Sequence, residues 1–484
     1  MSQWALFITV YLLGTSICLA LGPRRHPVLC CALGFPIGLA VLAGIELLFL
    51  GTGVPFTRVT GLVAMLIVFA AAIVWLRRAR PSRFVWQRAA WSTLAFVLVS
   101  YVITRENLSV LTYDSHYILL VSGAIARDGV LWPGMLGMLG NYGVFQILAH
   151  SLVLFTDHGF LWALQPMFAA SAIAVFAIAL AQGLDALGVK LRWRALAIAV
   201  VTFATFSIYM LLRHAFYIQT NFATATYLLV FCTLFWLSEI EQETSRLPVA
   251  FVAIFAVALQ RIEGPLICVL FLSLSVLPSR LPSRALLPGL LGASVAVFGW
   301  YMLLATGASE DSKFLSPTRS YLMACVLLGF TGYVALSRWR WSTPLPWLNR
   351  RAPLLVPALF ALALALAFAL QLDHMRKSAA GWLQCLTVTP YWEHAWVVIC
   401  GLALLGLAIP GVPFRWMFVC GIPCNMALIL LLVLKRTPYY VGMGDSAARM
   451  AIHVVPLAFF YFGLKFLPLL AHEPSASSQV TGDR

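Results

Sequence analysis

The sequence predicts an all-α polytopic membrane protein. Hydrophobic residues make up 62% of the 484 residues and charged residues only 10%, whereas a soluble domain carries about 25% charged residues. Apolar runs of about 20 residues recur along the chain, and this is the length that a helix needs to cross a bilayer. Lipid admits only helices and closed barrels, and runs of this length form helices. We therefore expect about 13–15 transmembrane helices, with further helices lying along the extracytoplasmic surface.

Each apolar run predicts one span. In chain order the expected spans cover residues 4–21, 28–50, 57–76, 89–104, 159–182, 195–212, 222–239, 249–260, 264–277, 285–305, 321–336, 354–371, 394–410, 416–435 and 450–468. The runs at 249–260 and 264–277 are short for two separate crossings, because a span needs roughly 17–25 residues. We expect this pair to form a turn of two short helices.

The basic residues predict the orientation of the chain. The formal net charge is +15, and many basic residues lie in short loops between the expected spans. These are Arg24 and Arg25; Arg77, Arg78, Arg80 and Arg83; Lys190, Arg192 and Arg194; Arg280 and Arg284; and Arg338, Arg340, Arg350 and Arg351. Short loops rich in Lys and Arg mark the cytoplasmic side. The positive charge is thus a topology signal, and we expect no nucleic-acid partner.

The longest outer loop runs from Arg105 to His158 and contains the polar segment SVLTYDSHYILLVSGAIARDG at 109–129. It predicts two juxtamembrane helices, one after Asp114 and one at 142–156. Capping is an alternative role for Asp114, because aspartate is a favoured N-cap and Gly129 a favoured C-cap for the first helix. Other titratable groups of this loop are Glu106, His116 and His150. On the second helix we expect Gln146, His150 and Asp157 to share one face.

Three further outer segments carry polar residues. Arg213, His214, Gln219 and Asn221 lie between two spans; Arg261 and Glu263 lie in the turn between the two short helices; and Asp445, Arg449 and His453 recur at intervals of four. A charge inside the membrane costs about 2.5–3.5 kcal/mol on insertion scales, so such residues are candidates for function. The alternatives are a position at the interface or an internal ion pair, such as Asp445 with Arg449.

Several common types of site have no signal in this sequence. The ten cysteines lie mostly in or beside expected spans, without zinc spacing or a disulfide pattern. We therefore predict no protein metal site. The sequence also has no nucleotide-binding glycine loop, which argues against an ATP-driven pump.

The outer-loop aspartate Asp114, the RIEG turn at 261–264, and Arg449 followed by Pro456 resemble the GT-C superfamily of membrane glycosyltransferases. The resemblance covers roughly residues 89–468. It implies transfer of a sugar from a polyprenyl-phosphate donor to a lipid, glycan or protein acceptor on the extracytoplasmic side. The implied location is the inner (plasma) membrane of a bacterial-type envelope, with the active site facing the periplasm or exterior.

The resemblance also implies roles for individual residues. Asp114 is the expected general base on the acceptor hydroxyl, and Arg261, Arg449 and Arg213 are expected to bind the donor phosphate. The expected substrate pocket contains His116, Glu106, His150, Glu263, Asp445 and His453. An acidic pair that is common in the family is replaced here by Asp-Ser-His, which leaves open whether a divalent cation is a cofactor.

The implied organisation has four parts. N-terminal transmembrane helices occupy 1–88, and a GT-C-like catalytic module with the outer loop 105–158 occupies 89–305. C-terminal helices and outer loops occupy 306–468, followed by a polar cytoplasmic tail at 469–484. Three spans precede the one that leads to the loop, whereas the family usually has the loop after its first helix. Acceptor recognition is expected from the outer loops 307–320 and 372–393.

Two other functions remain as alternatives. A secondary transporter or lipid flippase is expected to have two related halves with broken helices at matching positions, and the sequence has one such break, at 261–265. An O-antigen-type polymerase or ligase also needs outer arginines, but its large loop is central, whereas the large loop here lies in the first third of the chain. These differences favour the glycosyltransferase.

Overall fold

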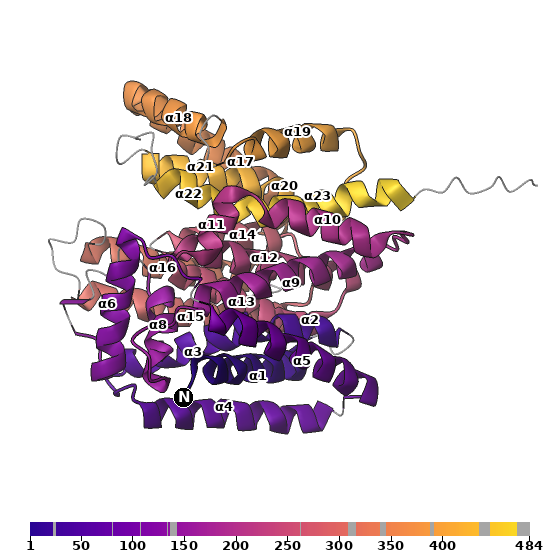
Figure 1. The fold of residues 1–484 in the computed structure, drawn as a ribbon. Helices are drawn as coiled ribbons and strands as arrows, with labels where there is room; N and C mark the ends of the chain where they lie inside the picture. The colour runs from indigo at the N-terminus through magenta and orange to yellow at the C-terminus, as the bar shows by residue number, and fades with distance from the viewer. Residues whose placement is uncertain are drawn as a thin grey trace, which may run out of the picture.

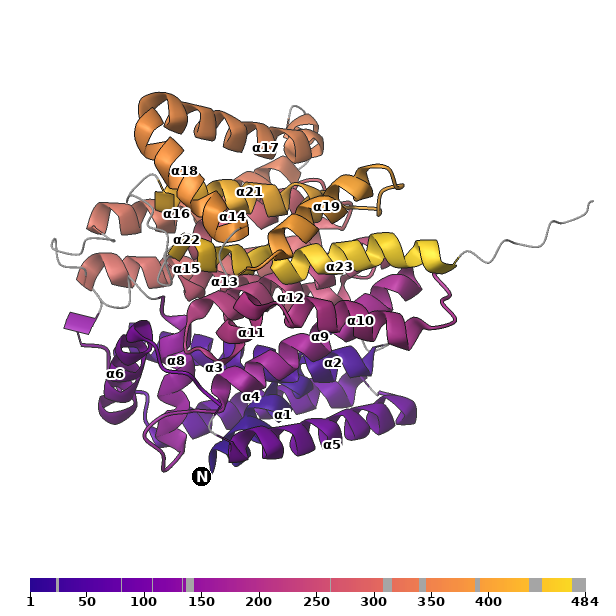
Figure 2. The ribbon, with the colours of Figure 1, turned by 45° about the horizontal axis from the view of Figure 1, so that its top comes forward.

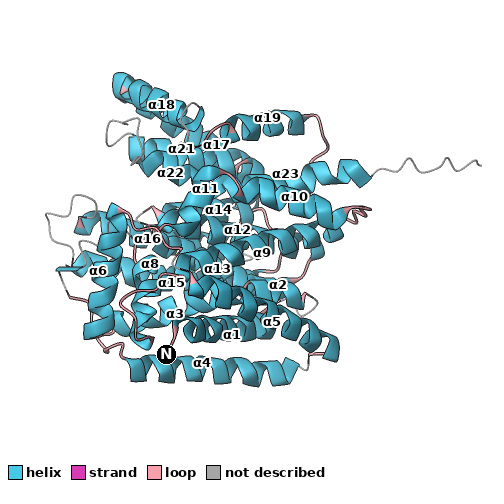
Figure 3. Cartoon of the chain, viewed as in Figure 1, coloured by secondary structure: helices cyan, strands magenta, loops and turns pink. Residues whose placement is uncertain are grey.

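The chain folds as a bundle of helices. A computed structural model describes residues 1–22, 26–79, 81–106, 108–132, 134–135, 143–261, 263–307, 316–338, 345–387, 392–434 and 446–471. The described residues contain helices and loops, and a single parallel bridge joins Val110 to Tyr217 (Figure 3). The all-α membrane fold expected from the sequence is confirmed.

The elements follow one another in this order. They are α1 (Gln3–Leu21), α2 (Pro27–Ala32), α3 (Gly34–Gly51), α4 (Arg58–Ala79), α5 (Arg83–Arg105), α6 (Tyr113–Asp128), α8 (Phe145–Ser151), η1 (Leu152–Phe155), α9 (Leu164–Ala186), α10 (Arg194–Phe206), α11 (Tyr209–Phe216), α12 (Thr220–Glu241), η2 (Thr244–Arg246), α13 (Leu247–Gln260), α14 (Gly264–Ser275), α15 (Ser283–Gly307), α16 (Pro317–Arg338), α17 (Leu345–Leu370), α18 (Leu372–Thr387), α19 (Ala395–Leu407), α20 (Trp416–Val419), α21 (Gly421–Ile429), η3 (Leu430–Leu434), α22 (Ser446–Met450), η4 (Ala451–Val454), α23 (Val455–Phe466) and η5 (Leu467–Ala471).

Nine helices of the described chain are long and apolar enough to cross a membrane, and the bent pair α10–α11 is a tenth if it counts as one span. The sequence predicted more spans because several apolar runs form shorter helices, among them α13, α14 and α19. The 14 residues of α13 and the 12 of α14 extend about 21 Å and 18 Å at 1.5 Å per residue. Neither reaches across the roughly 30 Å of hydrocarbon. The expected pair of short helices is therefore present.

The bundle is built around α12. Its apolar window is 94% buried, and α9, α13 and α23 pack against it (Figures 1 and 2). At the N-terminal side α1 and α3 approach closely at glycines. A Cβ on Gly14 would lie 1.9 Å from the carbonyl oxygen of Gly34. Small residues permit this spacing, which is typical of tightly packed membrane helices.

Helix α6 crosses the ends of the long helices nearly at right angles, while the α4–α5 and α9–α10 connections lie at the opposite end (Figure 1). This arrangement is the one expected of a juxtamembrane helix. Thr112 is the N-cap of α6, and its side chain and that of Ser115 form a capping box. The capping role considered for Asp114 is therefore wrong, because a threonine two residues earlier fills it. Gly129 closes the helix at φ 69°, as expected.

Helix α8 and its extension η1 form the second expected helix of the outer loop. Gly143 enters it at φ 75°, and a Cβ there would lie 1.8 Å from the carbonyl oxygen of Gln260, so this turn requires glycine. The predicted shared face of Gln146, His150 and Asp157 is wrong. The helix ends before Asp157, whose carboxylate lies 3.7 Å from the guanidinium of Arg58.

Candidate functional site

The turn between α13 and α14 carries a largely buried ion pair. Arg261 Nε lies 2.7 Å from Glu263 Oε1, although the N–H is not aligned for a hydrogen bond. The two side chains are 19% and 7% exposed. The turn is tight, because a Cβ on Gly264 would lie 2.5 Å from the carbonyl oxygen of Ala258. The local sequence therefore holds a charged pair at the end of two apolar helices.

Asn221, in the first turn of α12, connects this ion pair to the last helices of the chain. Arg261 Nη1 donates a hydrogen bond of 2.9 Å to Asn221 Oδ1. His453 Nε2 lies 3.2 Å from the same oxygen. Because the amide oxygen accepts from Arg261, the imidazole nitrogen of His453 is the donor. Asn221 and His453 are 1% and 0% exposed, so this buried group joins three segments that are distant in sequence.

Two more arginines lie in the same region. The guanidinium of Arg213, on α11, donates to the hydroxyl of Tyr217 and lies 4.9 Å from the centre of its ring. The next residue, His214, is buried. Arg213, Arg261 and Arg449 all lie within electrostatic range of its imidazole. Arginines from α11, the α13–α14 turn and α22 therefore lie near one buried histidine.

The start of α6 is attached to the same region. Val110 N donates to the carbonyl oxygen of Phe216 at 2.9 Å, and Ser115 Oγ donates to that of Ile218 at 3.2 Å. Gln219 Nε2 donates to the Thr112 hydroxyl at 3.3 Å. These bonds fix the first turn of α6 beside the segment that leads into α12. The backbone of residue 114 belongs to this first turn, whereas its side chain lies outside the part of the chain that the structure describes.

We refer to Arg213, His214, Asn221, Arg261, Glu263, Arg449 and His453 as the arginine cluster. It includes all three arginines that the sequence predicted for the donor phosphate, together with Glu263 and His453. Asn221 and His214 were recognised in the sequence as outer polar residues but were given no role. Their function as connectors depends on contacts between distant segments, and no local motif indicates such contacts.

The other predicted residues have different positions. Glu106 and His116 are exposed, and His116 Nδ1 lies 3.0 Å from the carbonyl oxygen of residue 112 within its own helix. His150 is buried on α8, and neither ring nitrogen has a hydrogen-bond partner among the described residues. No described contact joins these three residues to the arginine cluster. Asp445 lies outside the described residues.

The chemistry of the arginine cluster suits an anionic group. Guanidinium groups bind phosphate oxygens through paired, charge-assisted hydrogen bonds. The described residues of the cluster include three guanidinium groups and one carboxylate, that of Glu263, which pairs with Arg261. In that part of the chain no group of three or more His, Cys, Asp and Glu side chains is arranged to hold a metal ion.

Comparisons with known protein families, with characterised proteins and with solved structures find no match for this chain.

Proposed function

We propose that this protein is a membrane glycosyltransferase of the GT-C type, which transfers a sugar from a polyprenyl-phosphate donor to a lipid, glycan or protein acceptor. The observation that carries the proposal is the convergence of Arg213, Arg261 and Arg449 at the end of the bundle where α6 begins. The proposal requires that a lipid-linked phosphate enters this region from the membrane and that an acceptor hydroxyl enters it from water.

In the proposed reaction Asp114 takes the proton of the acceptor hydroxyl, and the acceptor oxygen attacks the anomeric carbon of the sugar. The bond between that carbon and the phosphate oxygen breaks, and the lipid phosphate leaves with the electron pair. Arg261, Arg449 and Arg213 stabilise the negative charge that develops on the phosphate. Asn221 orients Arg261 through the 2.9 Å hydrogen bond, and Glu263 holds it from the other side. The balance is one glycosidic bond formed and one sugar–phosphate bond broken.

The proposed enzyme has a defined orientation in the membrane. The α4–α5 and α9–α10 connections, which carry many of the arginines, lie at the end opposite α6 (Figure 1). The positive-inside rule assigns the basic end to the cytoplasm. The arginine cluster then faces the periplasm or exterior, where polyprenyl-phosphate sugars are used without a nucleotide.

Arg261 provides a direct test with farnesyl phosphate and farnesol, which differ only in the phosphate. Purified wild-type protein is expected to bind farnesyl phosphate more tightly than farnesol. Arg261→Ala is expected to weaken farnesyl phosphate binding by about tenfold or more, because a charge-assisted hydrogen bond contributes roughly 1.5–3 kcal/mol. Arg127→Ala is the control, since Arg127 is exposed and pairs with Asp128 on α6 at 2.7 Å. Equal effects of the two substitutions would remove Arg261 from the phosphate site.

Asp114 is tested by activity. The polyprenyl-phosphate sugar that copurifies with the protein, identified by mass spectrometry, serves as the donor. Asp114→Asn is expected to abolish sugar transfer while farnesyl phosphate binding and thermal melting stay at wild-type values, because the amide cannot accept the proton. Retained transfer would exclude Asp114 as the base.

A transporter remains the second candidate, because the bundle contains broken helices. The axes of α10 and α11 differ by 76° across a two-residue break, and α13 and α14 are separated by the turn that carries Arg261. Broken helices are typical of transporter binding sites. Proteoliposomes distinguish the candidates: a flippase moves a labelled polyprenyl-phosphate sugar between leaflets unchanged, whereas the enzyme releases polyprenyl phosphate when an acceptor is added.

A further inference from the structure

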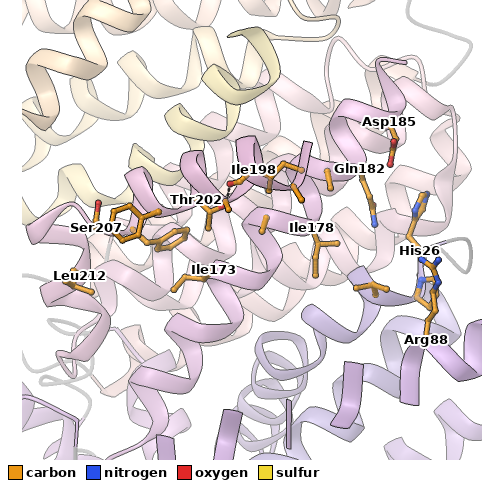
Figure 4. A pocket seen from close by; sticks show the side chains of 18 residues that line it. His26, Arg88, Ile173, Ile178, Gln182, Asp185, Ile198, Thr202, Ser207 and Leu212 are labelled. Carbon is orange, nitrogen blue, oxygen red and sulfur yellow. Dashed lines mark hydrogen bonds between the residues drawn. The ribbon is translucent and has the colours of Figure 1, made fainter. Parts of the chain in front are cut away.

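A second site lies on the side of the bundle, away from the arginine cluster. A cavity of about 1040 Å³ opens between α2, α5, α9 and α10 (Figure 4). Its walls are mostly apolar, and the apolar stretch runs along α10. We call this cavity the lateral groove. Neither the proposed donor site nor the proposed chemistry uses it.

Small side chains create the groove. Ala177 and Ala181 on α9 are one turn apart, and so are Ala195 and Ala199 on α10; all four line the cavity. Residues at this spacing share one face of a helix. These alanines leave space between the two helices, and larger side chains such as Ile178 and Phe203 complete the walls. The alanine patterns therefore contribute to the shape of the groove.

One end of the groove is polar. His26, Arg88, Gln182 and Asp185 lie together there, whereas Ser207 and Leu212 mark the other end (Figure 4). The polar end is formed by the starts of α2 and α5 and the end of α9, which is the side of the basic connections. An amphiphile that follows this pattern has its head at the basic end and its tail along α10.

The charges of the polar end favour an anion. Asp185 is neutralised by Arg194, whose Nη1 lies 2.5 Å from its carboxylate. Arg88 is exposed, stacks on Phe84 at 4.3 Å and forms no ion pair among the described residues. Burial, with a smaller effect of the positive charge of Arg246, lowers the pKa of His26, which makes it a neutral hydrogen-bonding group near pH 7. Glu241 lies 4.0 Å from His26 Nε2, and its charge is balanced by Arg246, whose Nη2 lies 2.6 Å from the same carboxylate. The remaining charge that faces the groove is therefore the guanidinium of Arg88.

The length of the groove matches one leaflet. Its lining extends along α10 from Ala195 to Phe206, which is about 17 Å at 1.5 Å per residue. Half of a bilayer's hydrocarbon core is roughly 15 Å thick. A tail that starts at the membrane surface and ends near the bilayer midplane thus fits along α10.

We propose that the lateral groove binds an anionic phospholipid of the cytoplasmic leaflet, with its phosphate at Arg88 and His26 and an acyl chain between the alanine faces of α9 and α10. The site requires no sugar donor. Its existence is independent of the proposed glycosyltransferase activity.

Native mass spectrometry of the purified full-length protein tests the site. The probes are palmitoyl-oleoyl phosphatidylglycerol and the phosphatidylcholine with the same acyl chains. Wild-type protein is expected to retain phosphatidylglycerol preferentially. Arg88→Ala is expected to weaken phosphatidylglycerol binding by about tenfold, since it removes a charge-assisted contact to phosphate, and to leave phosphatidylcholine binding unchanged. Arg83→Ala is the matched control, because Arg83 is exposed at the start of the same helix and does not line the groove.

Ala199→Trp tests the tail. Ala199 is exposed within the groove, so an indole there occupies the groove without disturbing the packed core. This variant is expected to reduce binding of both lipids, whereas Leu196→Trp, on the exposed side of the same helix, is expected to have no effect. Melting temperatures near the wild-type value establish that all variants fold.

Three outcomes would overturn the proposal. Equal losses for Arg83→Ala and Arg88→Ala would mean that the headgroup is attracted only by general charge. Unchanged lipid binding in Ala199→Trp would exclude the groove. Binding of farnesyl phosphate in the groove, but not of phosphatidylglycerol, would make the groove part of an isoprenoid path. Arg261→Ala is expected to leave phosphatidylglycerol binding intact, which separates this result from a failure of the proposed function.

Discussion

Asn221→Leu removes the acceptor that joins Arg261 to His453 and keeps the same number of side-chain heavy atoms in the same branched arrangement. The hydrogen bond from the charged guanidinium, 2.9 Å long, contributes roughly 1.5–3 kcal/mol, and the one from the neutral imidazole, 3.2 Å long, contributes about 0.5–1.5 kcal/mol. Because all three groups are at least partly buried, water does not replace the lost acceptor. We expect a loss of about 2–4 kcal/mol in the free energy of unfolding.

The measurement is equilibrium unfolding by SDS in mixed micelles, followed by circular dichroism. Thr224→Val is the control, because Thr224 lies one turn further along α12, is equally buried, and donates its hydroxyl to the Thr220 carbonyl within its own helix. This substitution is expected to cost about 1 kcal/mol or less, since no contact between segments is lost. If the two variants lose equal stability, or if Asn221→Leu loses none, Asn221 does not join the three segments.

Three further substitutions test the segment 105–158 by the same unfolding assay. Gly143→Ala is expected to destabilise the protein by more than about 1 kcal/mol, because the site has a positive φ and the new Cβ would collide with the carbonyl oxygen of residue 260. Gly123 has no atom within 4 Å of an added Cβ, so Gly123→Ala is expected to stabilise α6 by about 0.5–1 kcal/mol. The reverse order of stabilities would contradict the backbone conformations at these two glycines. Hydrogen bonding from Arg127 lowers the pKa of the partly exposed Asp128 to about 2, so the stabilisation by its ionised form exists near neutral pH and disappears as the pH falls through about 2. Asp128→Asn is therefore expected to be less stable than wild type near neutral pH and equal to it below about pH 2, and a difference that persists in acid would exclude the ion pair as its cause.

The lengths and polarity of the runs predicted the membrane class and the positions of most long helices, although the runs at 28–50 and 195–212 each form two helices. The short pair at 249–260 and 264–277 emerged as α13 and α14, and Gly129 ends α6 as its position indicated. These features are local. A backbone in lipid must satisfy its own hydrogen bonds, so an apolar run becomes a helix wherever it occurs.

The number of complete crossings was less predictable. Short apolar helices such as α19 have the composition of a transmembrane span but are too short to cross the membrane. They are stabilised by contacts with neighbouring helices, and composition does not identify those neighbours. The cap of α6 was also missed, because Thr112 and Ser115 form a reciprocal pair of bonds that outweighs the preference of a single aspartate for the position.

The sequence by itself determined that polar and charged residues, including Arg213, Arg261 and Arg449, lie near the ends of apolar runs. Tertiary structure alone decided that Asn221 receives hydrogen bonds from residues 40 and 232 positions away in the chain, and that the alanine faces of α9 and α10 oppose each other as a groove. The physical reason is that helix formation depends on neighbours within a few residues, whereas the meeting of polar groups depends on how separate helices pack against one another.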